Sequence, residues 1–234
     1  VVVSIFVNPA QFGPGEDFKK YPRTVAADVR LLHQVNTPLI VFTPSVADMH
    51  PDSHLHQVTA DEELRSVLCG KFRPGHFDGV CSAVARLFNM IGPCRAYFGE
   101  KDFQQLLIVK AMVRRHKIPA RIIRCPIIRE PDGLAMSSRN RYLSAAERKA
   151  ALVLFRALRA ARACARSGEH RAGHLRQAAL KILRTERDFR LQYLDLRSES
   201  TMGLVKALAP ATRARLFVAG HIGKTRLIDN CRLN

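Results

Sequence analysis

The chain opens with the apolar run VVVSIFV, and this run constrains the fold more than any other feature of the sequence. A strand that is apolar on both faces is typical of a parallel sheet covered by helices on both sides. Such a strand also needs hydrogen-bonded neighbours at both edges, because its backbone groups otherwise lack partners. We therefore expect Val1 to Val7 to form a buried strand within a larger parallel sheet.

Short apolar runs alternate with helical periodicity as far as Cys125, which is the pattern of βαβ units. After the first run, strands are expected in the segments PLIVFTP, RAYFG and ARIIRC. Helices are expected near residues 25–35, 80–89 and 103–117. The sequence thus predicts an α/β domain with a mainly parallel sheet over residues 1–125.

From Pro126 onward the pattern changes and predicts a second, smaller α/β domain over residues 126–234. A hairpin turn is expected at Pro131-Asp132-Gly133, followed by two basic helices and by strands in FRLQYLDLRS and ARLFVAGHIGKTRLIDN. Ser144 and Glu147 have the spacing of a capping box, so the first basic helix is expected to begin there. It is expected to end at Ser167-Gly168.

The formal net charge of +18 raises the possibility of nucleic-acid binding, because clustered cations release counterions from phosphates. The arginines are nevertheless spread along the chain, and those at positions 156, 159, 162 and 166 have the spacing of a solvated helix face. No aromatic interleaving or nucleic-acid-binding motif accompanies them. The charge therefore supports a polyanion partner only weakly, and no specific nucleic acid is expected.

Two further features bear on location. The apolar runs are far shorter than the roughly 20 residues of a membrane span, and no basic stretch precedes the first one. We therefore expect a cytoplasmic protein with no membrane partner. The six cysteines contain no C-x-x-C pair, which indicates free thiols rather than disulfides or a zinc site.

In an open parallel sheet, ligands bind beyond the carboxyl ends of the strands, so polar residues there are candidates for function. The first strand is followed by NPAQFG, a loop that can present the Gln11 amide to a substrate. RAYF is followed by GEKD, in which Lys101 lies beside helix amides that favour anions and Asp102 is a candidate N-cap. Gln105 is expected in the first turn of the helix that follows.

The segment GLAMSSRNRYLS brings two hydroxyl groups and a guanidinium together, because Ser137, Ser138 and Arg139 are consecutive. Charge-assisted hydrogen bonds from such a group can clamp a phosphate, and a mobile loop of this kind can close over a nucleotide. Each of the three segments alone is better interpreted as a surface turn. Their occurrence after successive strands favours one binding site.

Other polar groups have structural interpretations. Four residues with side chains that can bind metals are expected to lie on a surface loop and not to form a metal site: His50, Asp52, His54 and His56. His76 is expected to make a structural hydrogen bond, with a position lining the site as the alternative. Glu16 and Asp17 follow a Gly-Pro-Gly turn and are expected to be solvated or to cap a helix.

Five segments occur in a characteristic order and spacing: SIFVNPAQFGPGEDFKKYPRT, LCGKFRPGHFDGV, YFGEKDFQQLLIVKAMV, DGLAMSSRNRYLS and GKTRLIDN. Through these segments the chain resembles the pantothenate synthetase (pantoate-β-alanine ligase) family over nearly its whole length. The resemblance implies a Rossmann-like nucleotidylyltransferase domain that binds nucleotide and pantoate over residues 1–125. It also implies a C-terminal lid domain over residues 126–234 and assembly as a homodimer.

The activity implied by the resemblance is ATP-dependent amide formation. Pantoate attacks the α-phosphate of ATP to give pantoyl adenylate and pyrophosphate, and β-alanine then releases AMP to give pantothenate. The MSSR segment is similar to the flexible phosphate loop of class I aminoacyl-tRNA synthetases. Mg²⁺ is expected to arrive with ATP rather than in a dedicated protein site.

Site residues are also implied by the motifs. Gln11 and Gln105 would hold pantoate, and Gln11 would also lie near β-alanine. The catalytic residues would be Lys101, Ser137, Ser138 and Arg139. The residues that bind ATP would be Gly99, Glu100, Lys101, Asp102, Ile128, Met136, Ser137, Ser138 and Arg139. Among these, Lys101 would meet the phosphates, Asp102 the ribose side and Ile128 the adenine through its backbone.

Members of the resembled family begin with a further strand, a loop with a Met-Gly and His-x-Gly-His signature, and a helix. This first strand, loop and helix are absent before VVVSIFV, and position 1 is not methionine. We therefore expect an N-terminally incomplete chain. Two functions follow as alternatives. One is an active ligase, and the other is a truncated, catalytically impaired homologue that binds only ATP or a polyanion through its basic surface.

Overall fold

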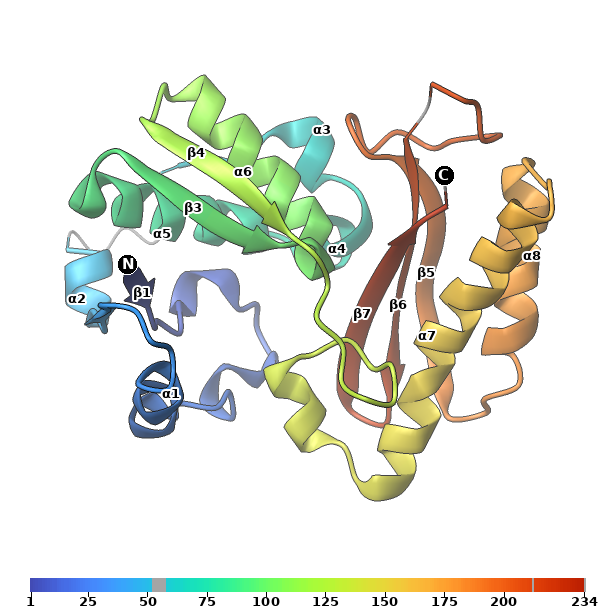
Figure 1. Cartoon of the computed structure of the whole chain (residues 1–234), viewed down its shortest axis with the longest axis horizontal. Coiled ribbons are helices and arrows are strands. Elements are labelled where there is room, and N and C mark those ends of the chain that lie inside the picture. Colours follow the sequence, from blue (N-terminus) through green and yellow to red (C-terminus); the bar gives the residue numbers. More distant parts are fainter. Residues whose placement is uncertain (52–57, 212, 234) are drawn as a thin grey trace. The chain divides into compact units, whose positions relative to one another are not determined.

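The structure, a computed structural model, describes residues 1–51, 58–211 and 213–233 (Figure 1). It divides into two compact units. The N-terminal unit comprises Val1–Ala96 and Ile108–Ile122, and the C-terminal unit comprises Tyr97–Leu107 and Ile123–Asn234. In the described parts of the chain, no helix is both long and apolar enough to cross a membrane.

The N-terminal unit begins with a βαβ arrangement. Strands β1 (Val2–Ser4) and β2 (Ile40–Phe42) pair in parallel, with Val3 opposite Val41, and helix α1 (Val25–Leu32) lies between them in sequence. Short helices follow: α2 (Val46–Met49), α3 (Glu62–Arg65) and α4 (Leu68–Phe72). Two 3₁₀ turns occupy Pro9–Gln11 and Asp17–Lys19.

Strand β1 is shorter and more exposed than its sequence predicts. It spans three residues, and the side chains before and within it are open to solvent, with Val1 72% and Val2 41% exposed. Among the described residues, β1 pairs with β2 only. None of the seven residues is buried, so the prediction of a buried strand over Val1 to Val7 is wrong for this structure.

Helix α5 (His76–Ile91) confirms the helix predicted near residues 80–89 and is longer at both ends. Glycines in left-handed backbone conformation flank it, Gly75 with φ of 77° and Gly92 with φ of 78°. Glycine adopts positive φ without steric cost, so it can start or stop a helix at these points. The apolar face of α5 is buried, with Phe77 and Val80 each 3% exposed.

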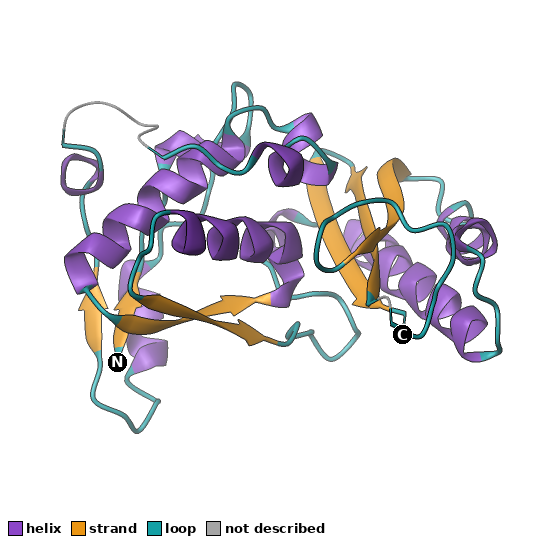
Figure 2. Cartoon of the chain, turned by 90° about the horizontal axis from the view of Figure 1, so that it is seen from above, coloured by secondary structure: helices purple, strands orange, loops and turns teal. Residues whose placement is uncertain are grey.

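Strands β3 (Cys94–Gly99) and β4 (Ala120–Cys125) are hydrogen-bonded neighbours joined through helix α6 (Phe103–Arg115). Figure 2 shows α6 running along this strand pair. These three elements confirm the predicted segments RAYFG, 103–117 and ARIIRC. A 3₁₀ turn over Glu100–Asp102 leads from β3 into α6.

The C-terminal unit carries helices α7 (Ala145–Arg166) and α8 (Ala172–Leu183) and an antiparallel sheet in the order β5-β6-β7. The strands are β5 (Phe189–Ser198), β6 (Ala214–Ile222) and β7 (Thr225–Arg232). The predicted capping box begins α7: the Glu147 amide donates to Ser144 Oγ at 3.2 Å, and the Ser144 amide donates to Glu147 Oε2 at 2.8 Å. The helix ends at Ser167-Gly168, as predicted.

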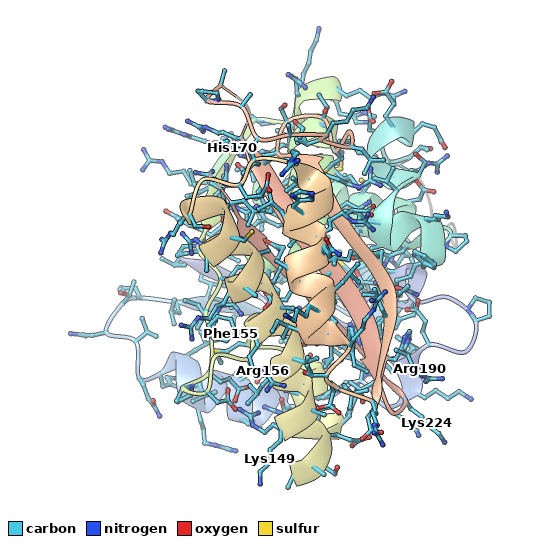
Figure 3. All side chains as sticks on the ribbon, turned by 90° about the vertical axis from the view of Figure 1, so that its right-hand side faces the viewer. Lys149, Phe155, Arg156, His170, Arg190 and Lys224 are labelled. Atoms are coloured by element: carbon cyan, nitrogen blue, oxygen red, sulfur yellow. The ribbon has the colours of Figure 1, made fainter. Side chains whose placement is uncertain are left out.

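Helices α7 and α8 cover one face of this sheet (Figures 1 and 3). Between the two layers lies a core of fully buried side chains that includes Leu154, Leu158, Leu175, Leu194, Leu196, Leu216 and Ile222. The six cysteines are free, which confirms their prediction as thiols. The α/β class with a separate C-terminal unit is confirmed, whereas the domain ranges 1–125 and 126–234 stay a prediction.

Candidate functional site

The turn Glu100–Asp102, called the lysine turn below, lies at the carboxyl end of β3, where the sequence predicts an anion site. Lys101 is partly buried, with a side chain 19% exposed, and its Nζ lies 3.9 Å from Asp102 Oδ2. At this separation the ion pair is weak, because the side chain of Asp102 is 51% exposed and solvated. The ammonium group of Lys101 is therefore available to a ligand phosphate.

The side chain of Glu100 anchors the lysine turn. Its carboxylate accepts from Arg124 Nε at 2.7 Å and from Arg215 Nη2 at 2.9 Å. The backbone of the turn is held as well, because Asn230 Nδ2 donates to the carbonyls of Glu100 at 3.0 Å and Lys101 at 2.9 Å. Both side-chain and backbone contacts thus fix the position of Lys101.

The arginines of this cluster keep the carboxylate of Glu199 ionised. Glu199 accepts from Arg215 and Arg232, and its side chain is 5% exposed. Burial alone raises the pKa of Glu199, but hydrogen bonds from Arg232 and Arg215 outweigh it and lower the pKa to about 2. The buried Arg215 therefore faces a charged Glu199 throughout the physiological pH range.

The second predicted segment forms a short helix rather than an open loop. Ser138–Tyr142 is a 3₁₀ turn, called the serine-arginine turn below, and the Arg139 amide donates to Ser137 Oγ at 3.3 Å. The expectation of a loop over Ser138 and Arg139 is therefore corrected, because the Ser137 hydroxyl caps a regular turn. Asn140 supports the turn by donating to Glu130 Oε1 at 2.7 Å and to the Ala135 carbonyl at 3.1 Å.

Ile128 and Met136 are joined by their backbones, since the Met136 amide donates to the Ile128 carbonyl at 3.0 Å. The predicted turn at Pro131-Asp132-Gly133 lies between them and is confirmed by a bond from the Gly133 amide to the Glu130 carbonyl at 2.8 Å. Both apolar side chains are exposed, Ile128 to 62% and Met136 to 54%. Exposed apolar groups beside peptide backbone suit a flat ring such as a nucleobase.

The charged side chains of the Ile128–Met136 segment are held by ion pairs. Arg148 donates to Glu130 Oε2 at 2.7 Å and to Asp132 Oδ2 at 2.8 Å. Hydrogen bonds from Arg148 and then Asn140 lower the pKa of Glu130. Asp229 pairs with both Nη atoms of Arg129, at 2.7 and 2.9 Å. Strand β7 thus contacts both the lysine turn and the serine-arginine turn.

The two residues predicted to hold pantoate, Gln11 and Gln105, lie on different units. Gln105 is the third residue of α6 and belongs to the C-terminal unit, which agrees with its prediction in the first helical turn. Gln11 belongs to the N-terminal unit and ends the 3₁₀ turn Pro9–Gln11. The Asn8 side chain caps that turn by accepting from the Ala10 amide at 3.2 Å.

The backbone of Gln11 is held by residues that follow it by about sixty positions. Its carbonyl accepts from His76 Nδ1 at 2.7 Å and from Arg73 Nη2 at 3.3 Å. Since arginine only donates, His76 Nε2 accepts from Arg73 Nη1 at 2.9 Å, which fixes the neutral tautomer with its proton on Nδ1. The structural hydrogen bond predicted for His76 is confirmed.

Two structural interpretations are changed by the structure. Glu16 lies at the N-cap position of the turn Asp17–Lys19, as one of its two predicted alternatives states, but its side chain makes no capping hydrogen bond. Its carboxylate instead accepts from Arg73 Nε at 2.7 Å and Nη2 at 2.5 Å. His50 is not on a surface loop: it is 6% exposed, and its Nε2 donates to Asn8 Oδ1 at 3.0 Å. The accompanying positions Asp52, His54 and His56 lie outside the described residues.

Sequence reasoning missed four residues that hold the candidate site. Asn8 and Arg73 fix the Gln11 loop, Asp229 fixes the Ile128–Met136 segment, and Asn230 fixes the lysine turn. The Asn-Pro pair at positions 8 and 9 is a local N-cap signal that the sequence contains. The other three make contacts across 62 to 130 positions, for which a single sequence carries no local signal.

Comparisons with known proteins identify the family. The family model described as pantoate-beta-alanine ligase matches residues 1–232. A pantothenate synthetase from Acidobacterium capsulatum is 48% identical over 233 residues, covering 100% of this chain and 77% of the relative. One from Pseudothermotoga lettingae is 44% identical over 229 residues, covering 98% of this chain and 80% of the relative.

Solved structures give the same result. Pantothenate synthetase from Thermus thermophilus superimposes with a TM-score of 0.94 at 44% identity, over 99% of this chain and 83% of that one. Pantoate-beta-alanine ligase from Francisella tularensis, complexed with β-γ ATP and β-alanine, has a TM-score of 0.78 at 34% identity, over 99% and 78%. The resemblance found in the sequence is confirmed, and the chain belongs to the pantoate-beta-alanine ligase family, a family of enzymes.

Proposed function

We propose that this chain condenses pantoate with β-alanine at the expense of ATP, giving pantothenate, AMP and pyrophosphate. One observation carries the proposal: in a member of a ligase family, β7 holds both the turn with Lys101 and the segment around Ile128 and Met136. The relative from Francisella tularensis was solved with an ATP compound and β-alanine, which are two of the three proposed substrates.

The first proposed step is adenylation. A carboxylate oxygen of pantoate forms a bond to the α-phosphorus of ATP, and the bond from that phosphorus to the bridging oxygen breaks, releasing pyrophosphate. Both reactants are anions, so the protein assists mainly by aligning them and by offsetting negative charge. Lys101 would supply that charge, with Ser137, Ser138 and Arg139 closing on the phosphates.

The second proposed step is aminolysis of the pantoyl adenylate. The neutral amine of β-alanine adds to the acyl carbon, and the carbon–oxygen bond to AMP breaks as the nitrogen loses a proton. AMP is a good leaving group at neutral pH, so positioning of the amine is the main requirement. Gln105 and Gln11 would orient pantoate through their amides, and Gln11 would also serve β-alanine; both roles stay predictions.

The remaining contacts with ATP are proposed by motif. Asp102 would face the ribose, and the Ile128 backbone would face the adenine. Gly99 and Glu100 would shape the turn, and Met136 would cover the nucleotide. For Mg²⁺, the lysine turn offers one exposed carboxylate, because Glu100 is engaged by Arg124 and Arg215. That fits an ion held mainly by the phosphates of ATP. A homodimer in the cytoplasm, with residues 126–234 as a lid domain, completes the proposal.

The test is pantoate-dependent formation of AMP in the presence of ATP, Mg²⁺ and β-alanine. Wild-type chain is expected to release AMP and pyrophosphate in equal amounts, and Gln105→Ala is expected to lose most of that turnover. The matched control is Gln177→Ala on the exposed face of α8, which should leave turnover unchanged. Folded wild-type chain that binds ATP but makes no AMP would support the impaired homologue instead.

A second candidate function, binding of a polyanion, is favoured by one surface. Five exposed cations follow each other along α7 without an acidic residue between them: Lys149, Arg156, Arg159, Arg162 and Arg166. Figure 3 labels Lys149 and Arg156 on this helix. Such a row attracts phosphate backbones by counterion release.

Fluorescence titration with a single-stranded RNA at several salt concentrations tests this candidate. Arg156→Glu with Arg159→Glu should weaken binding and flatten its salt dependence. Arg114→Glu with Arg115→Glu changes the net charge equally on exposed residues of α6 and should have a smaller effect. Equal loss in both double variants would assign the binding to overall charge rather than to α7.

A further inference from the structure

Two buried polar residues end the segment GKTRLIDN, and neither is among the residues proposed to contact a substrate. Asp229 is 3% exposed and Asn230 is 2% exposed, and both lie on β7 at the edge of the sheet β5-β6-β7. Side chains of this kind are rarely so deeply buried unless their hydrogen-bonding groups are satisfied. In this chain their partners belong to the candidate nucleotide site.

Asn230 holds the lysine turn through its side-chain amide. Nδ2 donates to two consecutive carbonyls, Glu100 at 3.0 Å and Lys101 at 2.9 Å. Oδ1 accepts from Arg215 Nη1 at 2.5 Å. Because arginine has no acceptor, this contact determines which end of the amide faces the turn. One side chain therefore fixes the backbone on both sides of Lys101.

Arg215 reinforces that arrangement from β6. It is 3% exposed, and its Nη2 donates to Glu100 Oε2 at 2.9 Å while its Nε donates to Glu199 Oε1 at 2.9 Å. Its guanidinium also lies 4.2 Å from the ring centroid of Phe103, the first residue of α6. Arg215 of β6 thus holds the Glu100 side chain and the start of α6, while Asn230 of β7 holds the backbone of the lysine turn.

Asp229 holds the Ile128–Met136 segment, which with the lysine turn forms the two arms of the candidate site. Arg129 Nη1 donates to Oδ2 at 2.7 Å and Nη2 donates to Oδ1 at 2.9 Å, which is a bidentate pair. Arg129 follows Ile128 directly, and its Nη1 also donates to the Gly133 carbonyl at 3.0 Å. The pair therefore fixes the turn that ends at Met136, where the adenine and phosphate contacts are proposed.

Neighbouring residues of a strand point to opposite faces of the sheet, so this dipeptide reaches two different segments. Asp229 shares its face with Cys231, whose Sγ contacts the Leu158 carbonyl of α7. Asn230 lies opposite Phe217 of β6, whose ring lies 6.0 Å from that of Phe103. An edge strand can thus hold one arm of the site on each face.

We propose that Asp229 and Asn230 are positioning residues that set the lysine turn and the Ile128–Met136 segment at a fixed separation, and that ATP affinity depends on this separation. The inference rests on the proposed function, since it assigns these two arms to ATP. It predicts that nucleotide binding is sensitive to residues that do not touch the nucleotide.

Calorimetric titration of the full chain with ATP and Mg²⁺, and separately with pantoate, tests the inference. Asn230→Asp is nearly isosteric but removes both donors to the lysine turn, and Asp229→Asn removes the charge that pairs with Arg129. Each variant should weaken ATP binding about tenfold or more, because a buried acceptor loses its partner or a charged pair is broken. The Kd for pantoate should change by less than a factor of about two.

Leu227→Ala is the matched control. Leu227 lies on the same strand, is 5% exposed and belongs to the hydrophobic core of the C-terminal unit. Its truncation should lower the Tm through loss of packing while leaving the Kd for ATP within a factor of about two. ATP binding that weakens in Leu227→Ala as much as in Asn230→Asp would reduce the effect to general destabilisation and overturn the inference.

Two further outcomes separate this inference from the proposed function. If Lys101→Ala abolishes ATP binding but Asn230→Asp and Asp229→Asn bind ATP like wild type, the positioning role is wrong and the ligase proposal stands. If the folded wild-type chain binds no ATP, both are wrong. Should Asn230→Asp fail to fold, Arg129→Lys keeps the charge, loses the bidentate geometry and must show the same selective loss of ATP affinity.

Discussion

At the scale of single residues, the arginines of the candidate site are closely paired with carboxylates and Lys101 is not. Arg124, Arg129 and Arg215 are each engaged by carboxylates at 2.9 Å or less, whereas Lys101 lies 3.9 Å from its carboxylate neighbour. These arginines stabilise the fold around the site, because breaking the pairs would leave a buried or partly buried charge without its partner. The ammonium group of Lys101 can therefore bind an anionic ligand.

The first prediction concerns Lys101. Lys101→Ala should raise the Kd for ATP by about ten to a hundredfold, which corresponds to losing one charged hydrogen bond to phosphate. Isothermal titration calorimetry measures the change, and Lys149→Ala on the exposed face of α7 is the control. Unchanged affinity in Lys101→Ala would remove this residue from the proposed phosphate contacts.

The second prediction concerns Glu199 and pH. Its pKa in the folded chain is about 2, below the ordinary value of 4.5, so its charge stabilises the fold above pH 4.5. That contribution is lost as the pH falls from about 4.5 toward 2. Glu199→Gln should therefore cost on the order of 2 kcal/mol of unfolding free energy at pH 7, and roughly half as much at pH 3.

Urea unfolding of wild type and Glu199→Gln at the two pH values measures the difference. Glu186→Gln, outside this arginine cluster, serves as the control and should show a small effect at both. A difference between wild type and Glu199→Gln that is the same at pH 3 and pH 7 would contradict the account.

At the scale of elements, the structure follows the sequence where the signals are local. Helix α7 begins at the predicted capping box and ends at the predicted Ser-Gly pair, and β5 matches FRLQYLDLRS in full. Strand β1 does not follow its apolar pattern, because burial depends on neighbours that a strand cannot supply for itself. The same limit applies to Asn230, whose contacts with the lysine turn are with residues 129 and 130 positions away.

The third prediction tests the start of α7. Ser144→Ala removes the hydroxyl that accepts from the Glu147 amide and should cost about 1 kcal/mol. Thermal unfolding should show a correspondingly lower Tm. Lys149→Ala on the same helix changes an exposed residue and should stay within about 0.5 kcal/mol of wild type. Equal stability of Ser144→Ala and wild type would mean that the capping box contributes nothing.

The fourth prediction compares two glycines in helices. A Cβ added to Gly79 of α5 would lie 2.2 Å from the Ala10 carbonyl oxygen, whereas one added to Gly173 of α8 would meet no atom within 4 Å. Gly79→Ala should therefore push the loop before Gln11 away and cost roughly 2 kcal/mol or more. Gly173→Ala should be neutral or stabilise by up to about 1 kcal/mol. Urea unfolding of both variants checks the contrast, and equal effects would contradict it.

At the scale of the whole molecule, nearly the full chain matches the pantoate-beta-alanine ligase family. Most of the net charge of +18 lies in the C-terminal unit, which also contains the candidate nucleotide residues. An excess of cations raises the local concentration of anionic substrates. The association rate of ATP should therefore fall as salt is added, faster than its dissociation rate changes.

The measurement that tests the central claim most directly follows oxygen from pantoate into AMP. Pantoate labelled with ¹⁸O in its carboxylate is incubated with the chain, ATP, Mg²⁺ and β-alanine, and the products are examined by mass spectrometry. Attack of the carboxylate on the α-phosphate predicts AMP that carries one heavy oxygen and pantothenate that keeps the other. Unlabelled AMP, or ADP in place of AMP, would contradict the proposed adenylation.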